Sequence, residues 1–291
     1  MSSLVASTLL NNRYRLGRCL GDGGFGVVYE AVDTVGDEVC AVKMMALASR
    51  EERVLRRALQ EARVTSRLAH PNIVEVFDFG VSLEPRAAYI AMERLRGEDL
   101  GRRVERCGSL APEEALGLLG DAAAALQAAH QAGVLHRDIK PTNLFLARGE
   151  AGPRLKVLDF GLAKILAETS GSTTTSTLGT PLYMAPEQFT GEPTTTTVDI
   201  FALGLCAFHL LTGRHYYALE RDQCTNAFAL GARLMRGVPE SAVSRAARYQ
   251  VSLSADFDAW FARATAPQPT ERFADPAEAV AALSESLAVA P

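Results

Sequence analysis

The sequence predicts an α+β protein with two lobes, in which a small antiparallel sheet with one helix precedes a mostly helical lobe. Up to about residue 95 the chain consists largely of short β-type runs separated by Gly and Asp turn residues. After Gly97 the apolar residues recur at helical spacing. At 291 residues the chain is long enough for two packed lobes with a sizeable buried core.

The sheet lobe is predicted over residues 14–95, after an N-terminal extension over residues 1–13. Its five strand-like runs cover residues 13–20, 26–33, 38–45, 72–80 and 87–93. Between the third and fourth runs, residues 50–68 carry apolar side chains near helical spacing and predict the single helix of this lobe. Pro71 follows this stretch and predicts that the helix has ended.

The helical lobe is predicted over residues 96–285 and is followed by a C-terminal tail over 286–291. Pro112 and the two glutamates after it begin a long helix, which Gly133 ends. Strand-like pieces cover residues 133–136, 143–147 and 154–160. The apolar run from Ile200 to Leu211 is too short to span a bilayer, so it predicts a buried core helix.

Composition and charge exclude several kinds of function. The net charge is −4 and no stretch combines dense Lys and Arg with aromatic residues, so we expect no nucleic-acid partner. The arginines clustered over residues 50–57 are mixed with glutamates, which is typical of a solvated helix face. Five scattered cysteines without a C-x-x-C pair argue against disulfides and zinc and favour the cytoplasm. We expect neither a secretory signal nor a membrane segment in this chain.

A glycine-rich turn after the first strand-like run is a candidate phosphate site. Glycine lets the backbone approach phosphate oxygens closely and offer N–H donors to their charge. The residues after the turn are strand-like, which favours a glycine-rich hairpin over the dinucleotide-binding motif, in which a helix follows. The turn consists of Gly21, Asp22, Gly23, Gly24, Phe25 and Gly26.

Lys43 lies between apolar residues on the next strand-like run. Alone, such a lysine could equally well extend its ammonium group to the surface. After a glycine hairpin, it is better interpreted as a point charge for nucleotide phosphates. It then needs a carboxylate partner, and Glu61, in the middle of the predicted helix, is the candidate.

The most specific motifs lie in the helical lobe. Residues 136–143 read HRDIKPTN, residues 159–161 read DFG and residues 185–187 read APE. With the glycine turn and Lys43 before them, they make the chain resemble the eukaryotic-like (Hanks-type) serine/threonine protein kinases. The resemblance implies the bilobal protein kinase fold. It covers residues from about 14 to 285 and includes Asp199, Gly204 and Arg272.

The resemblance implies transfer of the γ-phosphate of ATP to serine or threonine hydroxyls of proteins. Asp138 would orient the attacking hydroxyl and accept its proton, and Lys140 would neutralise charge on the γ-phosphate. Asn143 and Asp159 carry the oxygen ligands that suit Mg²⁺, with Mn²⁺ as an alternative ion. Either aspartate alone could instead be a loop cap or turn residue.

The resemblance also assigns an adenine pocket in the sheet lobe. Val28 and Ala41 would cover the ring, and Met92 would set the depth of the pocket. The backbone from Glu93 to Leu95 would meet the adenine edge. Core packing explains the same apolar residues equally well.

Three features bear on the acceptor and its control. Lys140 and Thr180 match the serine/threonine branch of the family. Arg137 suggests activation by loop phosphorylation, because a phosphate paired with an arginine orders a loop. The loop hydroxyls are those of Ser172, Thr173, Thr174, Thr175, Ser176 and Thr177. We expect autophosphorylation at one or more of Thr173 to Thr177, with a homodimer as one route, and a merely flexible polar loop is the alternative.

Glu187 and Arg272 are expected to form a buried ion pair that ties the Ala-Pro-Glu segment to the rest of the helical lobe. The alanine-, arginine- and glycine-rich stretch between the catalytic loop, residues 136–143, and Asp159 resembles bacterial members of the family. The expected partners are ATP and protein substrates.

Three other functions stay open. A pseudokinase would bind nucleotide and a protein partner without chemistry, but Lys43, Asp138, Asn143 and Asp159 are all present. Small-molecule phosphotransferases of related fold lack the Ala-Pro-Glu segment and the Ser/Thr-rich loop. A scaffold that docks a partner on the helical lobe is compatible with activity.

Overall fold

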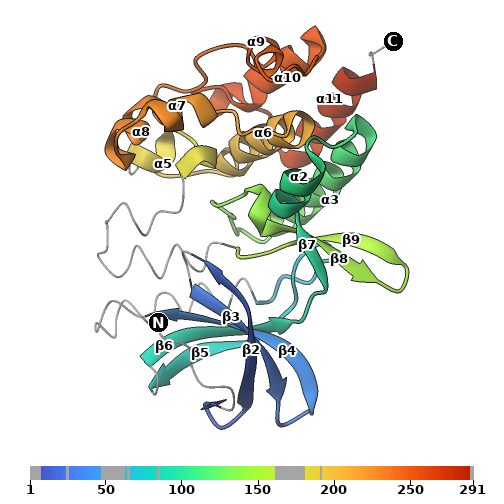
Figure 1. Cartoon of the computed structure of the whole chain (residues 1–291), viewed down its shortest axis with the longest axis vertical. Coiled ribbons are helices and arrows are strands. Elements are labelled where there is room, and N and C mark those ends of the chain that lie inside the picture. Colours follow the sequence, from blue (N-terminus) through green and yellow to red (C-terminus); the bar gives the residue numbers. More distant parts are fainter. Residues whose placement is uncertain are drawn as a thin grey trace. The chain divides into compact units, whose positions relative to one another are not determined.

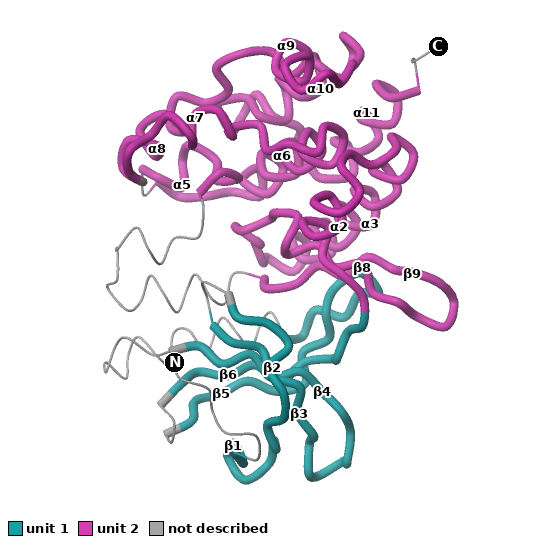
Figure 2. The backbone as a smooth tube through the Cα atoms, viewed as in Figure 1, with its two compact units in different colours: residues 1–96, 161–179 teal, residues 97–160, 180–291 magenta. Residues whose placement is uncertain are grey.

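The computed structural model describes residues 8–23, 26–46, 63, 66–83, 86–160, 181–190 and 192–288. These residues fall into two units, the first ending at Arg96 and the second beginning at Gly97 (Figure 2). The first unit is built on an antiparallel sheet and the second is mostly helical (Figure 1). The predicted α+β fold class is therefore confirmed.

The sheet of the first unit has six strands among the described residues, in the order β1-β2-β3-β4-β6-β5. The strands are β1 (Leu9–Leu10), β2 (Tyr14–Gly23), β3 (Gly26–Asp33), β4 (Glu38–Ala46), β5 (Val76–Leu83) and β6 (Arg86–Glu93). The sequence predicts five of them. Most of the predicted helix over 50–68, including Glu61, lies outside the described residues.

The additional strand is β1, which belongs to the predicted N-terminal extension. Leu9 pairs with Arg15 and Leu10 with Tyr14 on β2. The Leu10 side chain is fully buried in the core of the sheet. Burial of a leucine side chain stabilises a fold by about 1.5–3 kcal/mol, so this apolar contact explains why the extension joins the sheet.

Alternation along the strands divides the first unit's sheet into two faces. One face, here called the core face, buries Tyr14, Leu16, Val27, Tyr29, Ala31, Cys40, Val42, Met44, Ala87, Tyr89 and Ala91. The residues between them point to the opposite face, where Met45, Ala88 and Ile90 form a smaller buried cluster. The side chains of Val28, Lys43 and Met92 therefore belong to this second face.

The second unit begins with a small antiparallel sheet in the order β7-β8-β9. Its strands are β7 (Gly97–Asp99), β8 (Leu144–Gly149) and β9 (Gly152–Val157). The predicted long helix is α3 (Pro112–Gln131), which begins at Pro112 and ends just before Gly133. The other helices are α2 (Leu100–Cys107), α5 (Glu187–Thr190), α6 (Thr197–Thr212), α7 (Ala218–Gln223), α8 (Ala227–Leu234), α9 (Ala242–Ala247), α10 (Ala255–Ala264) and α11 (Pro276–Ala288). Short 3-10 turns are η1 (Pro141–Asn143), η2 (Pro181–Tyr183) and η3 (Pro269–Glu271).

The helix α6 lies at the apolar centre of the second unit, as predicted for the run from Ile200 to Leu211. Nearly all of its side chains are buried. Gly204 allows α10 to pack closely, because a Cβ at this position would lie 3.0 Å from the Cβ of Ala264. Among the described residues, no helix combines the length and the apolar character needed to cross a membrane.

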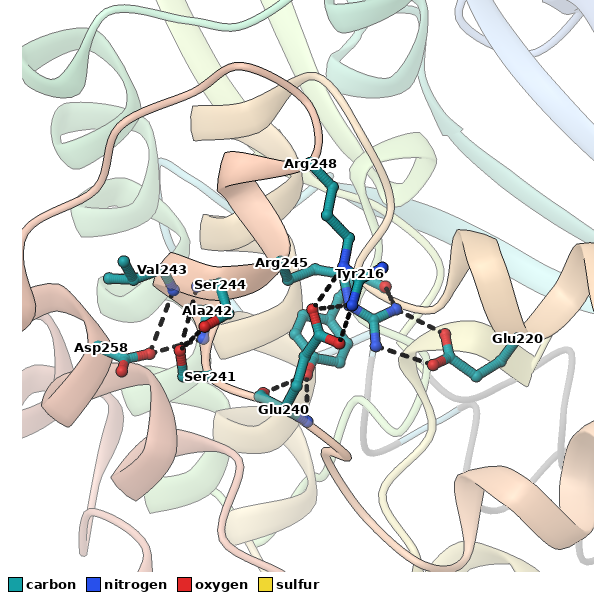
Figure 3. Close-up of polar contacts among 10 residues, drawn as sticks. All are labelled: Tyr216, Glu220, Glu240, Ser241, Ala242, Val243, Ser244, Arg245, Arg248 and Asp258. Carbon is teal, nitrogen blue, oxygen red and sulfur yellow. Dashed lines mark hydrogen bonds and ion pairs between the residues drawn. The ribbon is translucent and has the colours of Figure 1, made fainter.

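A buried arginine joins several segments of the second unit (Figure 3). The side chain of Arg245, on α9, is only 2% exposed. Its two Nη atoms each donate to one carboxylate oxygen of Glu220, on α7, at 2.8 Å. Its guanidinium also lies over the ring of Tyr216 and forms an ion pair with Glu240. This compensated buried charge links the α7 region to α9, and the sequence analysis did not identify it.

Candidate active site

Four residues predicted to bind nucleotide lie on the same face of the first unit's sheet. The strand register places Val28 opposite Lys43 and Ala41 opposite Met92. Because the alternate residues of these strands fill the core face, the four side chains share the opposite face. The structure therefore brings the predicted phosphate-binding lysine and the predicted adenine-pocket residues together on adjacent strands.

Lys43 is buried within this face, with only 5% of its surface exposed. It lies between Val28 on β3 and Ile90 on β6. A buried ammonium group is retained only where negative charge or hydrogen bonds compensate it. Its predicted partner Glu61 lies outside the described residues, so their ion pair stays a prediction.

The glycine-rich turn is a β-hairpin between β2 and β3, as the sequence predicts. Asp22 pairs with Val27 and Gly23 with Gly26, while Gly24 and Phe25 lie outside the described residues. Gly26 has a φ of 135°, and a Cβ there would collide with the carbonyl oxygen of Met44. Sheet packing therefore requires glycine at this position.

Gly21 differs from Gly26. It lies opposite Val28 in the strand register. A Cβ built on Gly21 would meet no described atom within 4 Å. Packing within the sheet therefore does not explain this glycine, whereas the close approach of a phosphate group to the backbone would explain it.

Glu93, the last residue of β6, is hydrogen-bonded to Glu75, which lies just before β5. Its backbone N–H donates to the Glu75 carbonyl at 2.9 Å, and its Oε1 accepts from the Glu75 N–H at 2.9 Å. The Glu93 N–H is therefore committed to the protein itself. An adenine edge at this segment would have to use the Glu93 carbonyl and the backbone of Leu95.

In the second unit, Asp199 holds the loop over residues 133–143. Its Oδ1 accepts from the Arg137 N–H at 2.7 Å, and its Oδ2 accepts from the His136 N–H at 2.9 Å. The Nε2 atom of His130 lies 2.8 Å from the same Oδ2. Residues 133–136 were predicted as strand-like but do not form a strand, because the backbone at the end of this piece bonds to the carboxylate of Asp199 instead.

Asp138 and Lys140, predicted to be catalytic, converge in this loop with Asn143, predicted to bind the metal ion. Lys140 Nζ donates to Asp138 Oδ2 at 2.7 Å. Asn143 Nδ2 donates to the Asp138 carbonyl at 2.7 Å and to its Oδ2 at 3.0 Å. The Asp138 side chain keeps 27% of its surface exposed, so a substrate group can still reach the carboxylate.

Asp159 is tied to the same loop through its neighbours in sequence. The Leu158 N–H donates to the Asn143 carbonyl at 2.9 Å, and the Leu158 carbonyl accepts from His136 Nε2 at 2.7 Å. The ring of Phe160 packs against that of His136 at 4.7 Å. Asp159 itself has a φ of 57°, which is uncommon for a residue other than glycine and recurs at functional sites.

Glu187 and Arg272 form the ion pair that the sequence predicts. The two Nη atoms of Arg272 donate to Glu187 Oε1 at 2.6 Å and to Oε2 at 2.9 Å. The Arg272 side chain is 0% exposed and the Glu187 side chain is 6% exposed. This pair fixes the first residue of α5.

The predicted phosphorylation sites and the predicted substrate-positioning residue lie outside the described residues. They are Thr173, Thr174, Thr175, Ser176, Thr177 and Thr180.

Two histidines that the sequence analysis did not identify are buried beside η2. The Tyr183 hydroxyl oxygen and His209 Nδ1 share a hydrogen bond of 2.6 Å, and the His215 ring packs edge-on against that of Tyr183, with 4.4 Å between the ring centroids. Burial lowers the pKa of His209 to about 4. Burial also lowers the pKa of His215 well below its ordinary range. Both rings are therefore neutral in the folded protein at pH 7.

Acidification should destabilise the chain through His209. An unfolded histidine binds a proton near pH 6.5, whereas the folded one binds it only near pH 4, so the stabilisation is lost as the pH falls between these values. We expect a loss of about 2 kcal/mol from this residue between pH 7 and pH 5. Urea unfolding at both pH values should show that His209→Gln, whose side chain can still form a hydrogen bond with Tyr183, removes this part of the loss. An equal loss in both proteins would contradict the assignment.

The family model for the protein kinase domain matches residues 14–281. The chain belongs to the protein kinase family. Serine/threonine-protein kinase PknE of Mycobacterium tuberculosis is 34% identical over 278 residues, which are 95% of this chain and 46% of the relative. PknH of Mycobacterium bovis is 33% identical over 94% of this chain and 44% of the relative. The chain thus spans less than half the length of these curated kinases.

Solved kinase structures give the same result. The crystal structure of the Mycobacterium tuberculosis PknI kinase domain matches with a TM-score of 0.76 and 27% identity, over 99% of this chain and 100% of that one. The bilobal protein kinase fold and membership of the serine/threonine kinases, both predicted from the sequence, are therefore confirmed. The matched relatives are bacterial, as the composition of the chain suggests.

Proposed function

We propose that the chain transfers the γ-phosphate of ATP to serine or threonine hydroxyls of proteins. The observation that carries the proposal is the arrangement around Asp138. Its carboxylate receives hydrogen bonds from both Lys140 and Asn143 and remains partly exposed. A carboxylate that is oriented by two donors and open to solvent is suited to hold an acceptor hydroxyl.

In this reaction Asp138 orients the hydroxyl and takes its proton. The hydroxyl oxygen forms a bond to the γ-phosphorus, and the bond from that phosphorus to the bridging oxygen breaks, so that ADP leaves with the electron pair. The ammonium group of Lys140, 2.7 Å from Asp138 Oδ2, keeps a positive charge beside the transferred group. The aliphatic acceptor is supported by the named serine/threonine kinases among the relatives.

Asn143 and Asp159 fit a divalent cation by their donor chemistry. Both side chains offer oxygen atoms, which suit Mg²⁺ and, as an alternative, Mn²⁺. The amide nitrogen of Asn143 is committed to Asp138, which leaves its Oδ1 as the oxygen for a cation. When bound, the cation would neutralise negative charge on the nucleotide phosphates.

The second face of the first unit's sheet supplies the proposed nucleotide contacts. Lys43 provides a buried positive charge for the phosphates, and the backbone at Gly21 leaves room for them. Val28, Ala41 and Met92, with the segment from Glu93 to Leu95, provide the adenine contacts. The strand register supports this set, because it places Val28, Ala41 and Met92 on the same face of the sheet as Lys43.

Control by loop phosphorylation, through Arg137 and one or more of Thr173 to Thr177, remains part of the proposal. Trans-phosphorylation within a homodimer is one route to it.

All five cysteines are described and all are free thiols, which supports a reducing compartment such as the cytoplasm.

Intact-mass analysis tests the proposed function. The wild-type chain and Asp138→Asn would both be treated with phosphatase and then incubated with Mg·ATP. We expect stepwise gains of phosphate in the wild type alone. Peptides covering residues 164–187 should carry the added groups. Equal gains in both proteins would mean that a contaminating kinase is the source, and phosphate absent from these peptides would contradict loop autophosphorylation.

A further inference from the structure

The peptide group that leads into Asp138 is held from both sides. This group joins the carbonyl of Arg137 to the N–H of Asp138. Its oxygen accepts from Gln188 Nε2 at 3.0 Å, and its N–H donates to His136 Nδ1 at 3.2 Å. Two hydrogen bonds on opposite ends of one peptide plane fix its rotation, and with it the direction in which the Asp138 side chain leaves the backbone.

Arg137 needs this support because its backbone is in the left-handed region, with a φ of 63°. This conformation is unfavourable for a residue with a Cβ and persists only where surrounding contacts hold it. Asp199 holds the Arg137 N–H and Gln188 holds the Arg137 carbonyl. Asp199 belongs to the site described above, whereas Gln188 has no role assigned so far.

The other end of Gln188 is equally constrained. Its Oε1 accepts from the Ala185 N–H at 3.0 Å. One partner of the side chain is thus a donor and the other an acceptor. An amide satisfies both, whereas an ionised carboxylate can only accept and an apolar side chain can do neither. The chemistry of these two partners therefore selects glutamine at this position.

The residue before Gln188 is held in place by a buried ion pair. It follows Glu187 in α5, and the Glu187 carboxylate is held by both Nη atoms of Arg272. A continuous series of contacts therefore leads from Arg272 through Glu187 and Gln188 to the peptide before Asp138. The Gln188 amide therefore joins the segment from Ala185 to Gln188 to the catalytic loop.

We infer that Gln188 is a positioning residue for Asp138 and acts through the peptide between Arg137 and Asp138. The inference rests on the proposed function, since it assigns a part to Gln188 in the same reaction. Loss of the amide releases one side of this peptide and lets the Asp138 carboxylate turn away from the acceptor hydroxyl. The chemical step then slows, while binding of nucleotide and of the protein substrate changes little.

Steady-state kinetics of two Gln188 variants test this role. Gln188→Leu removes both hydrogen bonds, and Gln188→Glu keeps the acceptor for Ala185 but presents a negative charge to the Arg137 carbonyl. We expect kcat to fall roughly 10- to 100-fold in both, with KM for ATP within about twofold of the wild type. The assay uses the full chain, Mg·ATP and a generic protein substrate, well below the melting temperature of each protein.

Thr190→Val is the matched control. The Thr190 hydroxyl donates to the Glu187 carbonyl at 3.1 Å within the same helix, so this change removes one hydrogen bond of α5 without touching the catalytic loop. It should leave kcat within about twofold. A fall in kcat as large in Thr190→Val as in the Gln188 variants would show that α5 acts only through its own stability.

Three other outcomes decide the inference. An unchanged kcat in either Gln188 variant overturns it. If neither Gln188 variant folds while Thr190→Val does, Gln188 is a structural residue and the inference is also overturned. If the wild-type chain transfers no phosphate to any protein, the proposed function itself fails, which is distinct from an active wild type with unaffected variants.

Discussion

Asp138→Asn should lower the rate of phosphate transfer to a protein substrate by roughly 100- to 10,000-fold, the usual contribution of a positioned general base. Asparagine has nearly the same shape, and its amide oxygen can still accept from Lys140 and Asn143, as the carboxylate does at 2.7 and 3.0 Å. It cannot take a proton from the acceptor hydroxyl. Initial rates of label transfer from ATP, with substrate in excess, measure this loss.

The Asp138→Asn protein should keep its fold and its affinity for Mg·ATP, because the changed atom belongs to the acceptor side of the reaction. Thermal melting and nucleotide titration check both points. Asp222→Asn is the matched control, since the Asp222 carboxylate is exposed and pairs with the adjacent Arg221. It should transfer phosphate at the wild-type rate. A rate for Asp138→Asn above one tenth of the wild type would mean that another group takes the proton.

Arg272→Ala should lower the free energy of unfolding by about 3–5 kcal/mol. The guanidinium is fully buried and donates to both oxygens of Glu187. It also donates to three carbonyl oxygens, those of Ala266, Pro267 and Thr197. Removing it leaves a buried carboxylate without its main partner and takes one hydrogen bond from each of three carbonyl groups, which is costly in a buried site.

In Arg272→Ala, the free energy of unfolding, measured with urea, and the rate of phosphate transfer should both fall. The same ion pair holds the first residue of α5 and therefore also the neighbouring Gln188. Arg263→Ala is the control, since the exposed pair of Arg263 with Glu278 contributes at most about 1 kcal/mol. Lost activity with an unchanged melting temperature in Arg272→Ala would contradict a stabilising role. Such a result would assign Arg272 to the reaction itself.

The catalytic loop and the glycine hairpin could be predicted because phosphate chemistry restricts residue types at fixed spacings. Asp138, Lys140 and Asn143 lie within six positions of one another, so their meeting follows from local geometry. The shared face of Val28 and Lys43 likewise follows from the period of two along a strand. In these cases the signal and the contact are both local.

Other parts of the site depend on contacts between distant residues. Gln188 reaches a carbonyl 51 positions before it, and His130 meets Asp199 across 69 positions. Neither residue stands in a pattern that identifies its partner. Arg245 is similar, because an arginine on a short helix predicts an exposed face until the fold places Glu220 beside it. The strand β1 is too short, at two residues, to give a periodic signal.

The identity of the phosphorylated amino acids is the most direct test of the central claim. The phosphatase-treated chain would be incubated with Mg·ATP and a generic protein substrate, and the phosphorylated positions of both proteins would be mapped by mass spectrometry. The account predicts phosphate on serine and threonine of the substrate with the wild type, and none with Asp138→Asn. Nucleotide binding without phosphate on any serine or threonine would contradict the account and favour a pseudokinase.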